Sequence, residues 1–242
     1  MILLLAGTSE ARDIATVLAQ ARTPVVASLA GVTREARPLP VETVVGGFGG
    51  TAGFEDFLQA RAIHAVVDAT HPFARDITAR TAAVCARRNL PYLRLARPAW
   101  SARTGDVWRE VERLEQATVF IPKTARVMAV TGRSTLPAFA AFAPREVLFR
   151  VVDPPQDPFP YPGRWLVGRP PLSIEDELRL MRREAVDWLV VKNAGGAGGR
   201  AKLEAARVLG VKVALLRMPP VAPDVECASS VAHALDWIGD HL

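Results

Sequence analysis

The chain has 242 residues, of which 50% are hydrophobic and 23% are charged, and its formal net charge is +5. This balance is typical of a globular protein and excludes a disordered or fibrous chain. No apolar run approaches the roughly 20 residues that cross a bilayer, and no basic segment precedes the apolar start of the chain. We therefore expect a cytoplasmic protein with no membrane partner.

Arginine dominates the basic residues. Only Lys123, Lys192, Lys202 and Lys212 are lysine, which leaves 26 of the 30 basic residues as arginine. The planar guanidinium matches phosphate and carboxylate groups, so this excess predicts a polyanionic ligand; a coding bias toward arginine is the alternative. Nucleic acid is not expected as a partner, because the chain has no basic run and no interleaving of basic and aromatic residues.

The two cysteines, Cys85 and Cys227, are too few for a disulfide framework or a metal site. Both lie in stretches with helical spacing. We therefore expect both to be small buried apolar residues, and we expect no bound metal.

The first predicted element is an apolar strand over residues 1–6. The turn Gly7-Thr8-Ser9-Glu10 follows it, and from Ala11 the apolar residues recur at helical spacing. The first N–H groups of a helix have no partner within the helix and carry partial positive charge, so they favour a bound phosphate. A dinucleotide site is therefore predicted at this turn. Only Gly7 of the three fingerprint glycines is present, so an ordinary first βα unit is the alternative.

Two further strands are predicted, over residues 24–29 and 41–45. No acid ends the first, and arginines including Arg34 follow it, a pattern that favours NADPH over NADH; a solvated surface loop is the alternative. The second ends in four glycines around Phe48, which let the backbone approach a ligand and let the ring cover a flat group. A flexible turn with Phe48 in the core is the other interpretation.

The fourth predicted strand, residues 64–68, brings Asp68, Thr70 and His71 to its carboxyl end, the edge at which ligands bind in parallel sheets. Pro72 keeps His71 out of helical geometry and suits the start of the next helix. His71 is expected either to contact a ligand or to be structural. The helix runs to about residue 89, and a fifth strand is predicted over residues 91–95.

Residues 98–105 interrupt this alternation with proline, tryptophan and glycine, and we place a domain boundary there. Strands are then predicted over residues 126–130, 147–152, 165–167, 188–191 and 211–216, and a closing helix over 231–238. The proline-rich residues 156–163 are expected to form a loop or a lid. Lys192 and Asn193 precede a loop with Gly195 and Gly196, which resembles an anion clamp; a solvated lysine beside a flexible loop is the alternative.

The alternating strands and helices predict an α/β protein with two Rossmann-like doubly wound lobes, parallel sheets and a cleft between the lobes. The first domain, residues 1–97, is expected to bind the nucleotide. The second domain, residues 98–242, is expected to form the substrate side of the cleft.

Seven stretches of the sequence together resemble the precorrin-6A reductase family, NADPH-dependent enzymes of cobalamin biosynthesis. They are LAGTSEAR at residues 5–12, SLAG at 28–31, GGFGG at 46–50, DATHPFA at 68–74, PYLR at 91–94, RVVDP at 150–154 and KNAGG at 192–196. None is specific alone, but the ordered set is. The resemblance implies reduction of one double bond in the macrocycle precorrin-6A to give precorrin-6B, with NADPH as hydride donor and a polycarboxylate tetrapyrrole as substrate.

The resemblance and the strand ends together give two sets of candidate residues. The cofactor-binding set lies in the first domain: Gly7, Thr8, Ser9, Glu10, Ala11, Ser28, Gly31, Thr33, Arg34, Gly47, Phe48, Gly49, Ala69 and Thr70. The substrate-binding set is His71, Arg133, Arg169, Lys192, Asn193, Gly195 and Gly196. His71 is also the candidate catalytic proton donor, beside the substrate's own imines or a bound water. The family often has an arginine where Val32 stands, so Thr33 or Arg34 would contact the 2′-phosphate.

Three other functions stay open. A short-chain dehydrogenase is disfavoured because neither Tyr92 nor Tyr161 has a lysine four residues on. A nucleotide-binding regulatory module without chemistry is disfavoured by the strand-end Arg133 and Lys192. The cobalt-precorrin-6A reductase of the anaerobic branch is the third. A monomer or weak homo-oligomer is expected.

Overall fold

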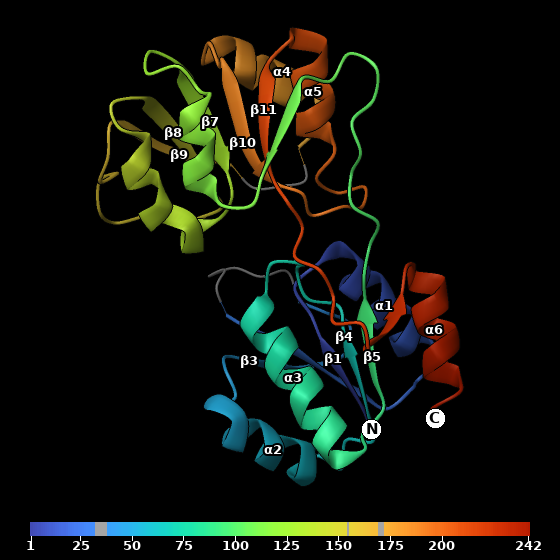
Figure 1. The fold of residues 1–242 in the computed structure, drawn as a ribbon. Helices are drawn as coiled ribbons and strands as arrows, with labels where there is room; N and C mark the ends of the chain where they lie inside the picture. The colour runs from blue at the N-terminus through green and yellow to red at the C-terminus, as the bar shows by residue number, and fades with distance from the viewer. Residues whose placement is uncertain (32–37, 154, 169–171) are drawn as a thin grey trace. The chain divides into compact units, whose positions relative to one another are not determined.

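The computed structural model describes residues 1–31, 38–153, 155–168 and 172–242, and it divides into two compact units (Figure 1). One unit consists of residues 1–98 and 219–242, and the other of residues 99–218. Each unit is built on a six-stranded sheet in which every recorded strand pair is parallel. The predicted α/β class with parallel sheets is confirmed.

The sheet of the first unit has the strand order β12-β5-β4-β1-β2-β3. Its apolar strands are buried on both faces, as parallel strands covered by helices are. The strands are β1 (Ile2–Leu5), β2 (Val25–Leu29), β3 (Glu42–Val45), β4 (Ala65–Asp68), β5 (Tyr92–Leu95) and β12 (Glu226–Ala228).

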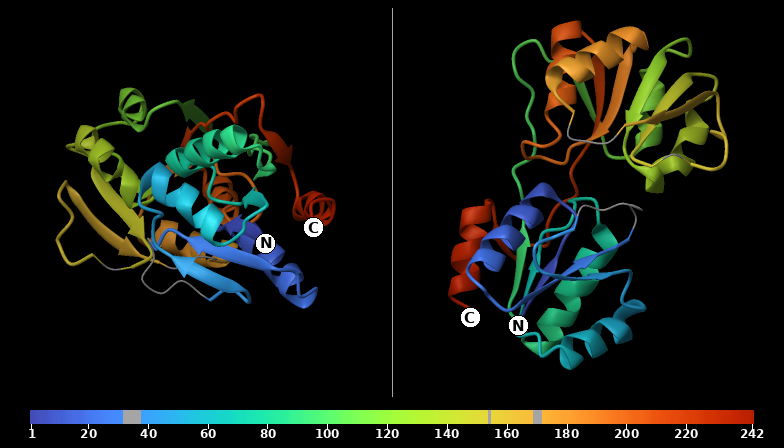
Figure 2. Two further views of the ribbon diagram at one scale, coloured as in Figure 1. Left: turned by 90° about the horizontal axis from the view of Figure 1, so that it is seen from below. Right: turned by 180° about the vertical axis from the view of Figure 1, so that it is seen from behind.

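Helices cover both faces of this first sheet (Figures 1 and 2). Ile2 and Leu4 of β1 belong to the core shared with α1 (Ser9–Gln20) and α6 (Val231–Gly239). Leu3 and Leu5 point the other way, into the core shared with α2 (Gly50–Ala60) and α3 (Arg75–Arg88). The alternation of side chains along one strand therefore joins two separate cores.

Residues 219–242 belong to the first unit, which differs from the expected second domain of residues 98–242. Strand β12 pairs in parallel with β5, so it extends the first sheet. Trp237 and Ile238 of α6 then pack into the same core as Ile14 and Leu18 of α1. The apolar face of the closing helix has its partner in the first unit, which explains why the chain returns there.

The sheet of the second unit has the order β6-β11-β10-β7-β8-β9. Helices α4 (Ile174–Arg183) and α5 (Ala201–Leu209) share a core with one face of it. The predicted short helix that ends near residue 142 is a 3-10 segment, η2 (Arg133–Phe142), with Pro137 inside it. A second such segment is η1 (Leu114–Val119). The strands are β6 (Trp108–Val111), β7 (Arg126–Val130), β8 (Glu146–Val151), β9 (Gly163–Val167), β10 (Trp188–Lys192) and β11 (Lys212–Leu216).

The proline-rich residues between β8 and β9 are held by aromatic contacts. The Phe159 ring lies 5.9 Å from that of Phe149 on β8 and 4.9 Å from that of Trp165 on β9. The Trp165 indole N–H also donates to the backbone oxygen of Asp157 at 2.9 Å. This connection therefore packs on the strands that it joins.

The two cysteines lie in different environments. Cys85 is buried on α3, as expected, but Cys227 is exposed on β12. The prediction of a buried helical residue is wrong for Cys227, because β12 is an edge strand with one side open to solvent.

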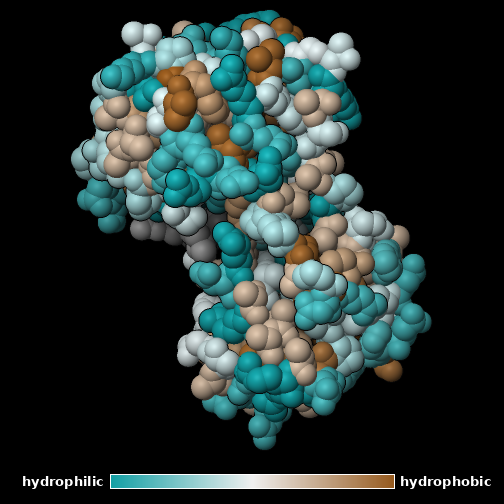
Figure 3. All heavy atoms as spheres, in the orientation of Figure 1, coloured by the Kyte–Doolittle hydropathy of each residue, from teal (hydrophilic) through white to brown (hydrophobic). Residues whose placement is uncertain are grey.

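Polar side chains cover much of the face of both units that Figure 3 shows, with hydrophobic residues scattered among them. Within the described ranges, no helix has both the length and the apolar character that a membrane span requires.

Candidate functional site

The carboxyl ends of the first unit's strands lie at one edge of the sheet. Leu5 at the end of β1 is in register with Ser28 on β2 and with Asp68 on β4. Ser28 is in turn paired with Val44 on β3. The structure therefore brings together Gly7 to Ala11, Ser28, Gly31, Gly47 to Gly49 and Ala69 to His71. Thr33 and Arg34 lie outside the described residues.

The turn between β1 and α1 is fixed by Thr8. Its hydroxyl accepts a hydrogen bond from the Ala11 N–H at 3.2 Å, as an N-cap residue does, and donates to the Ala69 backbone oxygen at 2.8 Å. Gly7 has φ +142°, a backbone conformation that is strained for any residue with a side chain, and a Cβ there would meet no atom within 4 Å. The start of α1 is thus locked to the end of β4 beside open space.

Glu10 would place a negative charge beside this turn, but Arg97 pairs with it. The Arg97 Nη1 lies 2.7 Å from Glu10 Oε1, and the two side chains are 12% and 17% exposed. Burial acts to raise the pKa of Glu10, but hydrogen bonds from Arg97, from its own backbone and from Ser9 outweigh it, so the pKa lies below its usual value. Arg97 therefore offsets the charge that would oppose an anion at the turn.

Asp68 is the centre of a buried polar network at the end of β4. Its carboxylate accepts hydrogen bonds from the Thr70 N–H and hydroxyl, the Thr78 hydroxyl and the Tyr92 hydroxyl, at 2.7–3.0 Å. Arg94 Nη1 donates to the same carboxylate and to Thr70 Oγ1. Burial and the nearby Asp68 charge raise the pKa of Tyr92. Asp68 is fully buried and its oxygens are occupied, so it orders the loop that carries Thr70.

His71 follows this network and is oriented by two neighbours. Its Nδ1 accepts a hydrogen bond from the Phe73 N–H at 3.2 Å, so the neutral ring carries its proton on Nε2. Arg94 Nη2 donates to the His71 backbone oxygen at 3.4 Å. The ring of His71 is therefore positioned by its own loop, and its backbone by Arg94 of β5.

Phe48 packs against aromatic residues of α2. Its ring lies 4.9 Å from that of Phe54 and 5.0 Å from that of Phe57, and it borders the core of the first unit. This placement corresponds to the second interpretation of the glycine loop, with Phe48 as a core residue.

The glycine loop after β10 is held by Trp100. The Asn193 side-chain amide accepts a hydrogen bond from the Trp100 N–H at 2.8 Å and donates to the Trp100 carbonyl at 2.9 Å. The Trp100 indole N–H donates to the Gly196 backbone oxygen at 2.7 Å. Because Asn193 is only 3% exposed, its amide supports the loop from inside.

Two candidate cations of the second unit lie at one edge of the sheet. Lys192 ends β10, and Arg133 follows β7, which pairs with β10. Burial lowers the pKa of Lys192, and Arg133 donates to the Asp153 backbone oxygen at 2.5 Å. Gly195 and Gly196, with φ +64° and +71°, continue the loop after Lys192. Arg169 lies outside the described residues.

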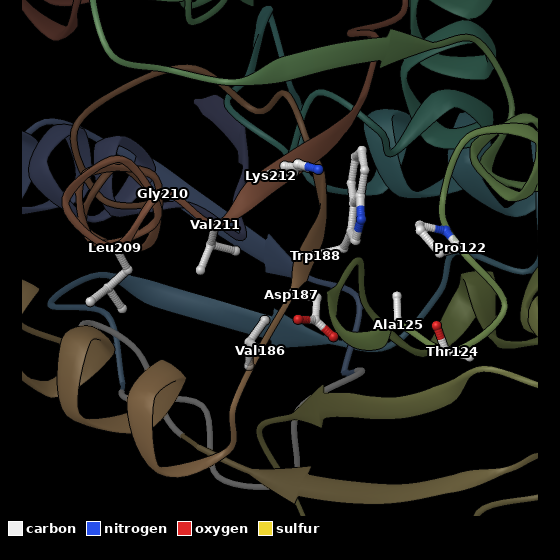
Figure 4. A pocket seen from close by; sticks show the side chains of 10 residues that line it. All are labelled: Pro122, Thr124, Ala125, Val186, Asp187, Trp188, Leu209, Gly210, Val211 and Lys212. Atoms are coloured by element: carbon white, nitrogen blue, oxygen red, sulfur yellow. The ribbon is translucent and has the colours of Figure 1, made fainter.

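A hollow of about 390 Å³ lies at the opposite edge of this sheet (Figure 4). It is lined by residues at the amino ends of β7, β10 and β11, among them Ala125, Trp188 and Lys212. Ligands of open parallel sheets bind at the carboxyl ends, so this hollow is separate from the candidate site.

The comparisons with known proteins cover the whole of this architecture. The family model described as "Precorrin-6x reductase CbiJ/CobK" matches residues 1–239. The chain belongs to the precorrin-6x reductase family. The resemblance that the seven stretches indicated is therefore confirmed.

Relatives within the precorrin-6x reductase family are similar over nearly their full length. A protein of Rhodococcus erythropolis named precorrin-6A reductase is 42% identical and aligns over 98% of this chain and 97% of its own. One of Rhodobacter capsulatus with the same name is 38% identical, over 99% and 96%. A solved structure titled "CobK precorrin-6A reductase" superposes with a TM-score of 0.94 at 38% identity and covers 99% of this chain and 96% of that chain.

Sequence reasoning missed three residues that support the site in this reductase family member: Arg94, Arg97 and Trp100. The sequence does indicate a role for Arg94, because a charged residue inside an apolar strand needs a buried partner. In the structure this partner is Asp68. Arg97 and Trp100 lie in the irregular stretch around the boundary, where no periodicity shows which contacts they make.

Proposed function

We propose that this protein is a precorrin-6A reductase of cobalamin biosynthesis, which uses NADPH to reduce one double bond of precorrin-6A and form precorrin-6B. The observation that carries the proposal is the match of the family model to residues 1–239. Two relatives that bear this name are 42% and 38% identical over nearly their full length. Their names also favour the cobalt-free substrate over the cobalt-containing one.

The strand-end residues of the first unit fit a dinucleotide. Gly7 borders open space, and Thr8 fixes the first turn of α1, whose N–H groups suit a pyrophosphate. Arg97 offsets the charge of Glu10 at the same turn. The remaining proposed cofactor residues lie on the neighbouring strand ends or in the loops after them: Ser9, Ala11, Ser28, Gly31, Gly47, Gly49, Ala69 and Thr70. We assign the 2′-phosphate to Thr33 or Arg34.

NADPH, when bound, supplies a hydride to one carbon of the macrocycle. The protein's own residues bind and orient the substrate. Arg133, Arg169 and Lys192 pair with its carboxylates, and Gly195 and Gly196 let the backbone approach it. Asn193 keeps this loop in place through its two hydrogen bonds with Trp100.

His71 is the residue of the site that can give a proton from Nε2, since Nδ1 accepts a hydrogen bond. A true general acid contributes roughly 10²–10⁴-fold to the rate. The substrate's imines or a water can also take this role, so we expect His71→Ala to slow turnover by less than about a hundredfold. A larger loss with unchanged NADPH affinity would assign the proton transfer to His71.

The test follows the NADPH absorbance band with purified protein and precorrin-6A. We expect loss of NADPH absorbance that requires substrate, and a much slower reaction with NADH. A parallel reaction with cobalt-precorrin-6A separates the two branches. Binding of NADPH without its consumption would leave the nucleotide site in place and overturn the substrate assignment.

A further inference from the structure

A buried ion pair lies at the carboxyl edge of the second unit's sheet. Arg150, near the end of β8, is 8% exposed, and Glu177, in the early turns of α4, is 2% exposed. Arg150 Nη1 donates to both Glu177 carboxylate oxygens, at 2.9 and 2.8 Å. The single negative charge of Glu177 is thus taken up by Arg150.

Lys202 adds a second cation to this pair. Its ammonium donates to the Gly199 backbone oxygen at 2.6 Å and lies 5.9 Å from the centre of the Trp100 ring. No ion pair between Lys202 and a carboxylate is recorded among the described residues. Burial and the nearby charge of Arg150 lower the pKa of Lys202 to about 8, against the opposing influence of Glu177. The cluster therefore holds two cations and one anion.

The position of Lys202 within its helix makes this charge more costly. Lys202 is in the first turn of α5, where the helix dipole disfavours a cation. Partial burial also disfavours the charged form, and the charge of Arg150 repels it. A ligand carboxylate beside the ammonium would offset all three penalties.

The surrounding backbone is built to bring Lys202 to the glycine loop. A Cβ on Gly199 would lie 2.8 Å from Cη2 of Trp100 and 3.2 Å from Nζ of Lys202. Only glycine therefore lets the ring and the ammonium approach this closely. The same loop begins at Lys192 and contains Gly195 and Gly196, so Lys202 borders the proposed substrate side.

We propose that Lys202 binds one carboxylate of a polycarboxylate tetrapyrrole through its ammonium group. This inference rests on the proposed function and extends it to a residue outside the strand-end cations. Arg150 and Glu177 hold the neighbouring charges in place, and Trp100 with Gly199 directs the ammonium toward the loop.

The small number of lysines allows a direct test by amine acylation and peptide mass spectrometry. The probe is uroporphyrin, a tetrapyrrole with eight carboxylates. The acylation rate of each lysine is measured at pH 8 with and without it. We expect the probe to slow acylation of Lys202 at least tenfold. Lys123 and Lys212, both exposed at the amino edge of the sheet, are internal controls whose rates should not change. Equal rates at Lys202, or no binding of the porphyrin, would overturn the proposal.

Matched variants separate binding from folding. Lys202→Met should weaken porphyrin binding at least tenfold, Lys202→Arg should retain it within about threefold, and Lys212→Met should leave it unchanged. A purely structural lysine would instead lower the unfolding temperature of Lys202→Met with no change in porphyrin affinity, and this result would also overturn the proposal.

The same variants distinguish failure of this inference from failure of the proposed function. If precorrin-6A is reduced but its KM is unchanged in Lys202→Met, the proposed reaction is supported and the proposed role of Lys202 is refuted. If the porphyrin protects Lys202 but precorrin-6A is never reduced, the carboxylate site stands and the reaction assignment falls.

Discussion

Asp68→Asn removes the carboxylate that pairs with the buried Arg94. The two side chains are 0% and 4% exposed, so the guanidinium would stay in the interior without a counter-charge. Breaking such a pair by changing one partner costs about 3–5 kcal/mol. The asparagine amide would also replace one of the two carboxylate oxygens with an NH2 group, so either the Thr70 or the Thr78 hydroxyl would lose its acceptor. We expect the unfolding temperature of the protein to fall by roughly 6–20 °C, since 1 kcal/mol corresponds to about 2–4 °C for a chain of 242 residues.

The assay is calorimetry of the wild type and the variant, with NADPH affinity measured in parallel. Glu55→Gln is the matched control, because Glu55 forms an ion pair with Arg87 whose side chains are 33% and 55% exposed. Exposed ion pairs contribute little to the free energy of unfolding, so this variant should unfold at the same temperature as the wild type. The reasoning is refuted if Asp68→Asn loses less than about 1 kcal/mol, or if Glu55→Gln loses as much as Asp68→Asn.

Two further predictions concern a helix glycine and the thiols. Gly→Ala within a helix normally stabilises by about 0.5–1 kcal/mol, but a Cβ on Gly53 would lie 1.8 Å from the Phe48 backbone oxygen. Gly53→Ala should therefore destabilise by about 1–3 kcal/mol in chemical denaturation. Gly239→Ala, where a Cβ meets nothing within 4 Å at the end of α6, should instead stabilise by up to about 0.5–1 kcal/mol; equal effects would contradict this. Burial raises the pKa of Cys85 to about 12, so only a trace is thiolate at pH 8. A disulfide reagent should titrate the exposed Cys227 in the native protein and Cys85 only after unfolding; a native reaction that persists in Cys227→Ser would disprove this.

The central strands could be predicted from the sequence because they are buried on both faces. β1, β4 and β10 read as apolar runs, and the structure places all three inside their sheets. The edge strands β6 and β12 were missed. Their residues are largely exposed, so neither has an apolar pattern by which it could be found. Periodicity also does not fix strand order, so it gave no sign that the end of the chain returns to the first sheet.

The position of the candidate site followed from the same rule, since parallel strands present their carboxyl ends at one edge. The same rule does not predict the buried residue pairs that hold the loops of this site. Asp68 and Arg94 are 26 residues apart, and Asn193 and Trp100 are 93 apart. Such pairs are set by tertiary packing, which local spacing does not encode. The sequence therefore predicts candidate residues at the strand ends, but not the buried partners that hold their loops.

The return of β12 and α6 to the first sheet also sets the order in which the two units can be completed during synthesis. Residues 99–218 are a continuous stretch, so the second unit has its whole chain before residue 219 leaves the ribosome. Until β12 follows, β5 is an open edge, and the face of α1 that packs with α6 is uncovered. Domains usually fold in chain order as they emerge. Here the first unit is completed only after the second, and its open strand edge and apolar helix face stay uncovered until residues 219–242 have been synthesised.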